Sequence, residues 1–121
     1  MVAALWVLAG AALGLLSLIV LWIMYLAVMA LQRARDAGAL SPFAMRAGQA
    51  LLAVGIVWDV LCNLLPVTVI FMELPREATV SARLRRLVRG PDGWRRRLAV
   101  WYAAVLLNPF SPGGPHIEIP Q

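Results

Sequence analysis

Charged side chains are scarce in this chain of 121 residues, and lysine is absent. Only 14% of the residues are charged and 62% are hydrophobic, whereas soluble domains average about 25% charged and about 45–50% apolar residues. The mean hydropathy is +0.80. The chain forms one unit, because it is too short for two soluble domains with separate cores. This composition argues against a soluble globular enzyme.

Cysteine and histidine each occur once, which removes most of the side chains that metal and redox sites need. Cys62 lies in an apolar run without a partner, so neither a disulfide framework nor a thiolate metal site is available. His116 has only Glu118 near it in the sequence, and a metal site needs more ligands. No histidine is placed by the sequence to activate Ser41, Ser81 or Ser111. We therefore expect a non-enzymatic protein without metal or cofactor.

The first 31 residues contain no charged side chain. A helix of this length exceeds the hydrocarbon thickness of about 30 Å, so residues 1–31 are predicted to form a transmembrane helix. Trp6 lies near one end and Trp22 and Tyr25 near the other, as in an aromatic belt. A cleaved signal peptide is the alternative. The missing basic leader and the long apolar stretch favour an uncleaved anchor.

A second apolar stretch, residues 47–72, follows a short connector at residues 32–46 and can also cross a membrane. Pro66 is expected to kink it. Asp59 falls near its centre, with Asn63 one turn later on the same face. An aspartate at mid-bilayer costs about 2.5–3.5 kcal/mol, and each neighbouring apolar residue offsets about 0.3–0.6 kcal/mol. Insertion therefore stays favourable, and Asp59 is expected to face protein rather than lipid.

An ionisable group inside a membrane indicates proton transfer, ion passage or pairing with the arginine of a partner. Asp59 and Asn63 are therefore the candidate intramembrane polar site. The structural alternative is a hydrogen bond across a helix hairpin, for example between Asp59 and Ser17. The apolar segments contain no second acid and no histidine, so a pore would need several copies of the chain.

The composition changes sharply after residue 72, where residues 73–97 hold eight arginines and three acids. Residues 73–107 are predicted to form basic amphipathic helices that lie in the membrane interface, and residues 108–121 an irregular tail rich in proline and glycine. Anionic lipid headgroups are the expected partners, and nucleic acid is the weaker candidate. The residues expected at that surface are Arg76, Arg83, Arg85, Arg86, Arg89, Trp94, Arg95, Arg96, Arg97 and Trp101.

Small residues on both apolar segments predict close helix contacts. Gly10, Gly14 and Ser17 share a stripe on the first segment, and Gly55 lies near the face of Asp59 on the second. The same stripes would serve packing within one chain or self-association of several copies.

The fold expected from these segments is an all-α membrane protein, a two-helix transmembrane hairpin followed by the basic interfacial helices and the tail. The eight-arginine segment predicts both ends in the cytoplasm by the positive-inside rule. In the alternative arrangement, residues 1–31 alone cross, residues 47–72 are re-entrant or covered by protein, and all 11 arginines lie in the cytoplasm.

A set of residues between 55 and 116 forms a recognisable pattern. Its members are Asp59, Asn63, Thr68, the run Phe-Met-Glu-Leu-Pro-Arg-Glu at 71–77, Thr79, Val80, Ala82, Arg83, Leu84, Gly93, Trp94, Arg95, Ala99, Trp101, the run Leu-Asn-Pro-Phe at 107–110, Gly114 and His116. With this pattern, residues 55–116 resemble a group of small integral membrane proteins of tailed bacteriophages and prophages. The similarity implies a phage origin and residence in the bacterial inner membrane, and it brings no established activity with it.

The sequence thus predicts a phage- or prophage-encoded inner-membrane protein that acts through protein contacts, for example in superinfection interference or membrane-associated assembly. Its partner would be a host or phage membrane protein, or a second copy of the chain. A holin-like lysis protein is the first alternative, with Asp59 and Asn63 turned toward a lumen. A membrane-anchored module that binds nucleic acid is the second.

Overall fold

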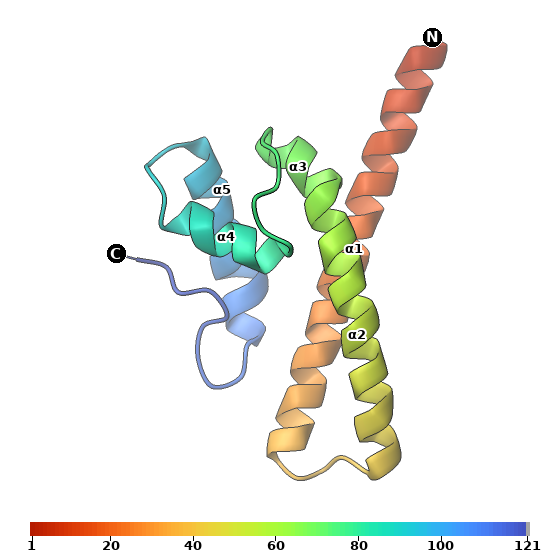
Figure 1. The fold of residues 1–121 in the computed structure, drawn as a ribbon, viewed down its shortest axis with the longest axis vertical. Helices are drawn as coiled ribbons and strands as arrows, with labels where there is room; N and C mark the ends of the chain where they lie inside the picture. Colours follow the sequence, from red (N-terminus) through yellow and green to blue (C-terminus); the bar gives the residue numbers. More distant parts are fainter. Residues whose placement is uncertain (121) are drawn as a thin grey trace.

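The computed structural model describes residues 1–120, and these residues form helices and loops without any strand. Two long helices form an antiparallel hairpin, and a smaller helical body lies against one side of it (Figure 1). The elements are α1 (Val2–Asp36), α2 (Pro42–Leu64), α3 (Pro66–Phe71), α4 (Val80–Val88), α5 (Trp94–Tyr102), a π-helical turn (Ala103–Leu107) and a 3-10 turn (Asn108–Phe110).

The predicted all-helical class and the two long apolar helices are confirmed. Val2–Asp36 and Pro42–Phe71 are each long and apolar enough to cross a membrane. The connector between α1 and α2 is shorter than expected, spanning residues 37–41 instead of 32–46. Ser41 explains the early start of α2, because its hydroxyl accepts a hydrogen bond from the Ala44 amide at 3.1 Å and Pro42 occupies the first helical turn.

Pro66 interrupts the second apolar stretch, as expected. Helix α2 ends at Leu64, and Leu65 adopts φ −108° and ψ −82° before α3 begins. Helix α3 then stops at Met72, whose φ of 52° lies in the left-handed region. This left-handed residue reverses the chain, so residues 73–79 return along the last third of α2 to Asp59 (Figure 1).

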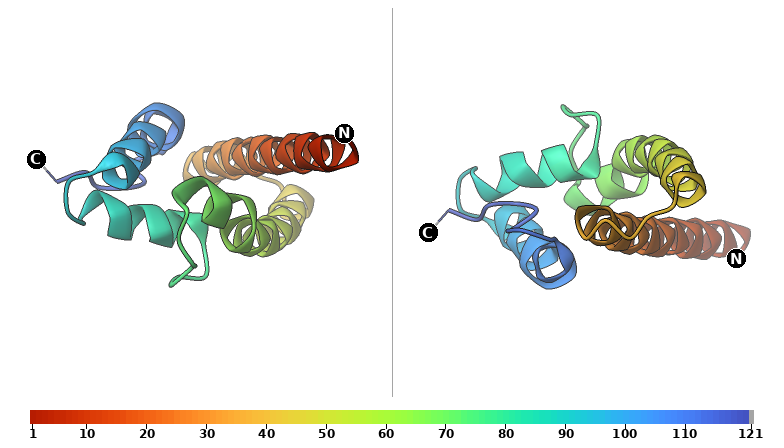
Figure 2. Two further views of the ribbon diagram at one scale, coloured as in Figure 1. Left: turned by 90° about the horizontal axis from the view of Figure 1, so that it is seen from above. Right: turned by 90° about the horizontal axis from the view of Figure 1, so that it is seen from below.

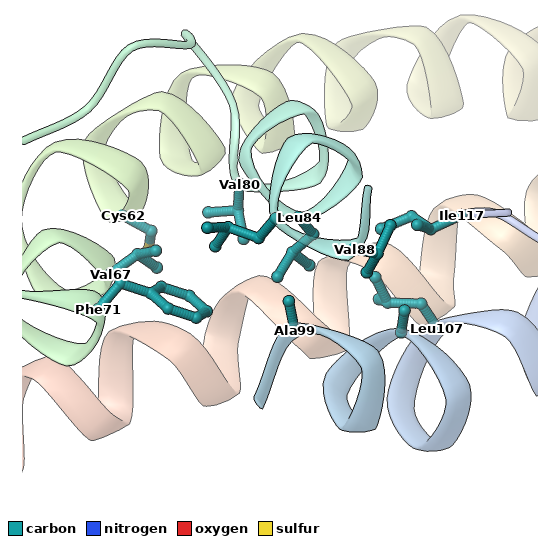
Figure 3. Close-up of a cluster of buried hydrophobic side chains, with 11 residues drawn as sticks. Cys62, Val67, Phe71, Val80, Leu84, Val88, Ala99, Leu107 and Ile117 are labelled. Atoms are coloured by element: carbon teal, nitrogen blue, oxygen red, sulfur yellow. The ribbon is translucent and has the colours of Figure 1, made fainter. Parts of the chain in front are cut away.

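The body beside the hairpin consists of α4, α5, the two short turns and the tail, as seen from both ends of the molecule in Figure 2. Its core joins the end of α2 and α3 to α4 and α5 (Figure 3). The buried members are Cys62, Val67, Phe71, Val80, Leu84, Leu87, Val88, Ala99, Ala103, Leu107 and Ile117.

The apolar stripe of α4 does not lie open for an interface, which differs from the amphipathic arrangement expected for residues 73–107. Leu84 and Val88 are 1% and 0% exposed. The small residues Ala99 and Ala103 let α5 approach this stripe closely, and both are fully buried. The stripe is therefore the core of a packed unit.

Residues 111–120 of the tail contain no helix, in keeping with the expected irregular structure, yet part of the tail is firmly packed. The side chain of Asn108 accepts a hydrogen bond from the Ile117 amide and donates one to the Ile117 carbonyl, each at 2.9 Å. Ile117 is fully buried in the core. The reciprocal pair ties the end of the chain back to the body.

Replacing Leu84 by alanine is expected to lower the free energy of unfolding by about 2–4 kcal/mol, because a buried leucine leaves a cavity behind. Leu74→Ala is the matched control, since Leu74 is 80% exposed. The measurement is thermal unfolding of the detergent-solubilised protein followed by circular dichroism. Equal effects of the two substitutions would show that α4 is not packed in this core.

Candidate functional site

Asp59 joins the body to the last third of α2. Its Oδ1 accepts a hydrogen bond from the backbone amide of Val80 at 2.7 Å. Val80 is the first residue of α4, and the adjacent Thr79 hydroxyl accepts a second bond from the Ala82 amide at 3.2 Å. A carboxylate is favoured at this position because the N-terminus of a helix carries partial positive charge. Asp59 thus acts as a cap supplied by another helix.

The partner of Asp59 differs from the one considered from the sequence. The Ser17 hydroxyl donates to the Leu13 carbonyl of its own helix at 2.8 Å. The Ser17 carbonyl accepts from the Trp58 indole at 3.0 Å, so Ser17 lies at the contact between α1 and α2 without reaching the carboxylate. The expectation that Asp59 faces protein agrees with this geometry, and the facing group is a helix N-terminus.

Asn63 and Arg83 form a second, fully buried polar contact between α2 and α4. The Asn63 side chain donates to the Glu77 backbone carbonyl at 2.6 Å, and the Asn63 backbone carbonyl accepts from Arg83 at 3.0 Å. Arg83 also donates to the Thr68 hydroxyl at 3.1 Å. Burial lowers the pKa of the Arg83 guanidinium, and the nearby carboxylates of Glu73 and Glu77 oppose that shift.

The burial of Arg83 corrects its assignment to the lipid-facing set, because its side chain is 0% exposed. Arg86 is also engaged inside the protein, where it forms ion pairs with Glu73 and Glu77. The sequence did not reveal either role, because every arginine of α4 looked alike within the amphipathic pattern. The arginines that remain exposed are Arg76, Arg85, Arg89 and Arg97, and both Trp94 and Trp101 are also exposed.

Aromatic residues of α1 hold the C-terminal turns by their polar tips. The Trp22 indole donates to the Leu106 carbonyl at 2.7 Å, and the Tyr25 hydroxyl donates to the Leu107 carbonyl at 2.6 Å. Arg33 donates to the Phe110 carbonyl further along α1. Trp22 and Tyr25 therefore join α1 to the body, whereas Trp6 is 73% exposed.

The small residues predicted for helix packing divide into two groups. Gly14 lies beside Pro66, where an added Cβ would be 3.6 Å from the Pro66 Cβ, and Ser17 lies at the same interface. Gly10 and Gly55 have no neighbour within 4 Å of such a Cβ. Gly48, near the same face of the second apolar stretch as Gly55, packs against α1, because a Cβ added there would lie 3.2 Å from a methyl carbon of Leu31.

Ser81 and His116 meet in a cavity of about 160 Å³ that sequence analysis missed. The Ser81 hydroxyl and His116 Nε2 are 3.1 Å apart, and the Tyr25 ring packs edge-on against the imidazole at 5.0 Å between centroids. Asp59 lines the same cavity. The two residues are far apart in the chain, and the tail was expected to be irregular, so no pattern indicated this pair.

The pair has part of what nucleophilic catalysis needs, namely a hydroxyl beside an imidazole. Burial lowers the pKa of His116, and the positive charge of Arg85 lowers it further.

Residues 1–120 contain no group of three metal-ligating side chains. Comparisons of this chain with models of protein families, with curated proteins and with solved structures find no match.

We expect Asp59→Ala to lower the free energy of unfolding by about 1–2 kcal/mol, as for loss of a helix cap, and Asp59→Asn to cost less because it keeps an acceptor. Amide exchange at Val80 should accelerate in the same order. Asp36→Ala is the control, since Asp36 forms only a surface pair with Arg35 at 3.5 Å. Unchanged Val80 exchange in Asp59→Ala would contradict the capping role.

Docking of the tail should weaken as the pH falls. The docked His116 has a lowered pKa, so the undocked tail binds the proton more readily and stability is greatest above the ordinary histidine pKa of about 6.5. Exchange of the Ile117 amide, measured from pH 7.5 to 5 and corrected for intrinsic rates, should show this loss. His116→Gln should remove the dependence. A pH response that persists in the variant would assign it to another group.

Proposed function

We propose that this chain is a non-enzymatic integral protein of the bacterial inner membrane, encoded by a phage or prophage, that acts through contacts with other proteins. Superinfection interference and membrane-associated assembly are roles of this kind. The proposal rests mainly on one observation: the N-terminal end of α1 is an exposed apolar helix, whereas the arginines lie mostly in the packed body. The phage origin rests on the resemblance of residues 55–116.

The free half of α1 supports the membrane anchor. Every large apolar residue that α1 exposes lies between Met1 and Ile23, and the exposed fractions range from 45% to 100%. Residues 1–13, which precede the approach of Gly14 to Pro66, rise about 20 Å, so a crossing of about 30 Å also includes the turns of α1 that pack against α3 and Trp58. From Gly14 onward, one side of α1 packs against α3, α2 and the body.

The position of the body favours a single crossing over the transmembrane hairpin with both ends in the cytoplasm. Asp59 lies near the centre of the second apolar stretch and holds the start of α4 there. Insertion of the whole hairpin would therefore carry exposed Arg85, Arg89 and Arg97 into hydrocarbon, at about 2.5–3.5 kcal/mol each. With α1 crossing alone, all 11 arginines lie on one side, which the positive-inside rule assigns to the cytoplasm.

The outer face of α2 supports the contact-based role. It exposes Val54, Val57 and Leu61 at 47–61% of their surface, whereas Leu52 and Ile56 line the cavity on the Asp59 side of the helix. Contiguous apolar surface of this kind is typical of protein interaction sites. The bond from Val80 holds Asp59 inside the protein, so no observation favours a lumen-facing aspartate and the holin-like alternative.

Cysteine labelling in spheroplasts tests the arrangement. In a Cys62→Ala background, a membrane-impermeant maleimide should label Ala3→Cys in intact spheroplasts, and Val54→Cys and Glu118→Cys only after lysis. Cys62 is 2% exposed, so its removal prevents background labelling with little change of surface. Labelling of Ala3→Cys and Glu118→Cys from the same side, with Val54→Cys protected, would instead establish the hairpin.

The same cells test the role. Membrane potential and culture density should hold steady after induction, because a contact-based protein opens no pathway for ions. Asp59→Asn is the comparison, since a pore lined by this aspartate would respond to the loss of its charge. Abrupt depolarisation by the native chain, altered by Asp59→Asn, would overturn the proposal in favour of a lysis protein.

A further inference from the structure

A groove of about 410 Å³ opens at one end of the body. The elements that line it lie toward the same end of the molecule as the N-terminus of α1 (Figure 1). Its walls come from the loop after α3, the end of α4 and the first turn of α5. Four arginines line it, and so do two carboxylates, Glu73 and Asp92. The volume falls in the range of about 300–1,000 Å³ that is usual for small-molecule sites. The lining arginines are Arg76, Arg86, Arg95 and Arg96.

The positive charge of this groove is only partly neutralised. Arg86 is paired with Glu73 and with Glu77 behind it. Arg95 donates to the Phe71 carbonyl at 2.7 Å, which positions the guanidinium without neutralising it. Within residues 1–120, Arg76 has neither a hydrogen bond nor an ion pair, and its side chain is exposed. The groove therefore attracts an anion.

The start of α5 adds to this attraction. Gly93 caps α5 without a side-chain hydrogen bond, and the first turn carries Arg95, Arg96 and Arg97 with no acid. Arginines at a helix N-terminus oppose the partial positive charge of the helix, whereas an anion there is stabilised by both. A phosphate in the groove would relieve this repulsion.

Apolar surface beside the groove distinguishes a lipid from a free anion. Met72 and Leu74 are 75% and 80% exposed at its edge, and Trp94 is 43% exposed within its wall. The Arg95 guanidinium lies 4.8 Å from the centre of the Trp94 ring. A cation above an amphipathic aromatic ring, flanked by bare apolar side chains, suits the boundary between headgroups and acyl chains.

The groove and the N-terminus of α1 lie toward the same end of the molecule. A Cβ added at Gly14 would lie 3.6 Å from the Pro66 Cβ at the start of α3, and α1 continues past α3 as an apolar helix (Figure 1). This inference rests on the proposed membrane function, and it names the lipid that the surface selects.

We propose that this groove binds the phosphodiester headgroup of an anionic phospholipid. Arg76, Arg95 and Arg96 hold the phosphate, and the acyl chains pass over Met72 and Leu74. Asp92, on the rim, accepts hydrogen bonds from headgroup hydroxyls, so phosphatidylglycerol is the preferred ligand and phosphatidylcholine a poor one.

Native mass spectrometry of the full chain in detergent, titrated with phosphatidylglycerol or phosphatidylcholine, tests the site. One phosphatidylglycerol should be retained per chain in preference to phosphatidylcholine. Arg76→Gln should weaken this binding about fivefold, as expected for one basic residue at an anionic surface. The matched control Arg85→Gln removes the same charge from an exposed residue outside the groove and should leave the binding unchanged. Circular dichroism checks that both variants fold.

Three outcomes would overturn the proposal. Equal weakening by Arg76→Gln and Arg85→Gln would show diffuse electrostatic attraction. Equal retention of the two lipids would show detergent-like coverage of apolar surface. Competition by millimolar inorganic phosphate that abolishes lipid retention in the native chain would show a site for the free anion.

The labelling of Glu118→Cys separates this inference from the proposed function. Cytoplasmic labelling without lipid selectivity would rule out the lipid site in the groove but would support the membrane arrangement. Selective lipid retention together with labelling from the periplasm would rule out the proposed membrane arrangement but would support the lipid site.

Discussion

The contact between Asp59 and the amide of Val80 decides how the whole molecule is arranged. It joins the last third of α2 to the first residue of α4, at 2.7 Å. Once α4 begins there, Leu84 and Val88 pack beside the hairpin, and α5 covers them. A carboxylate that would be costly in hydrocarbon is thereby satisfied by a helix N-terminus. The bond fixes where α4 starts, and the shared core then holds the arginine-rich body against the hairpin.

The neighbouring Asn63 and Arg83 contact makes this arrangement specific rather than merely stable. Nε and one terminal nitrogen of Arg83, and Oδ1 of Asn63, are buried without a hydrogen-bond partner in residues 1–120. Unpaired buried groups cost about 1–3 kcal/mol each, so an apolar pair of similar volume could be more stable. What the polar pair adds is register, because the guanidinium reaches the Asn63 carbonyl and the Thr68 hydroxyl in only one position of α4 along α2.

The sequence predicted the elements far better than their contacts. Local sequence features determine α1, α2 and the break at Pro66. The length of the apolar run determines the helices, Ser41 caps α2, and the proline lacks a backbone donor, so each feature acts within one segment. The docking of the body depends on backbone groups as partners: Trp22 binds the Leu106 carbonyl and Asp59 the Val80 amide. Backbone groups are the same at every residue, so no sequence pattern distinguishes the ones that are used. In the sequence, a tryptophan that anchors a neighbouring turn therefore cannot be distinguished from one that belongs to an aromatic belt.

The placement of charge follows from the same docking. Because α4 starts beside the last third of α2, its buried side takes Arg83, the side facing the α3 loop takes Arg86 with its two carboxylates, and the remaining arginines are forced outward. The turn into α5 then brings Arg95 and Arg96 to the same end of the body as the loop after α3. An anionic bilayer offers hydrocarbon to an apolar helix and phosphate to a basic groove, so one boundary can satisfy both features of this molecule.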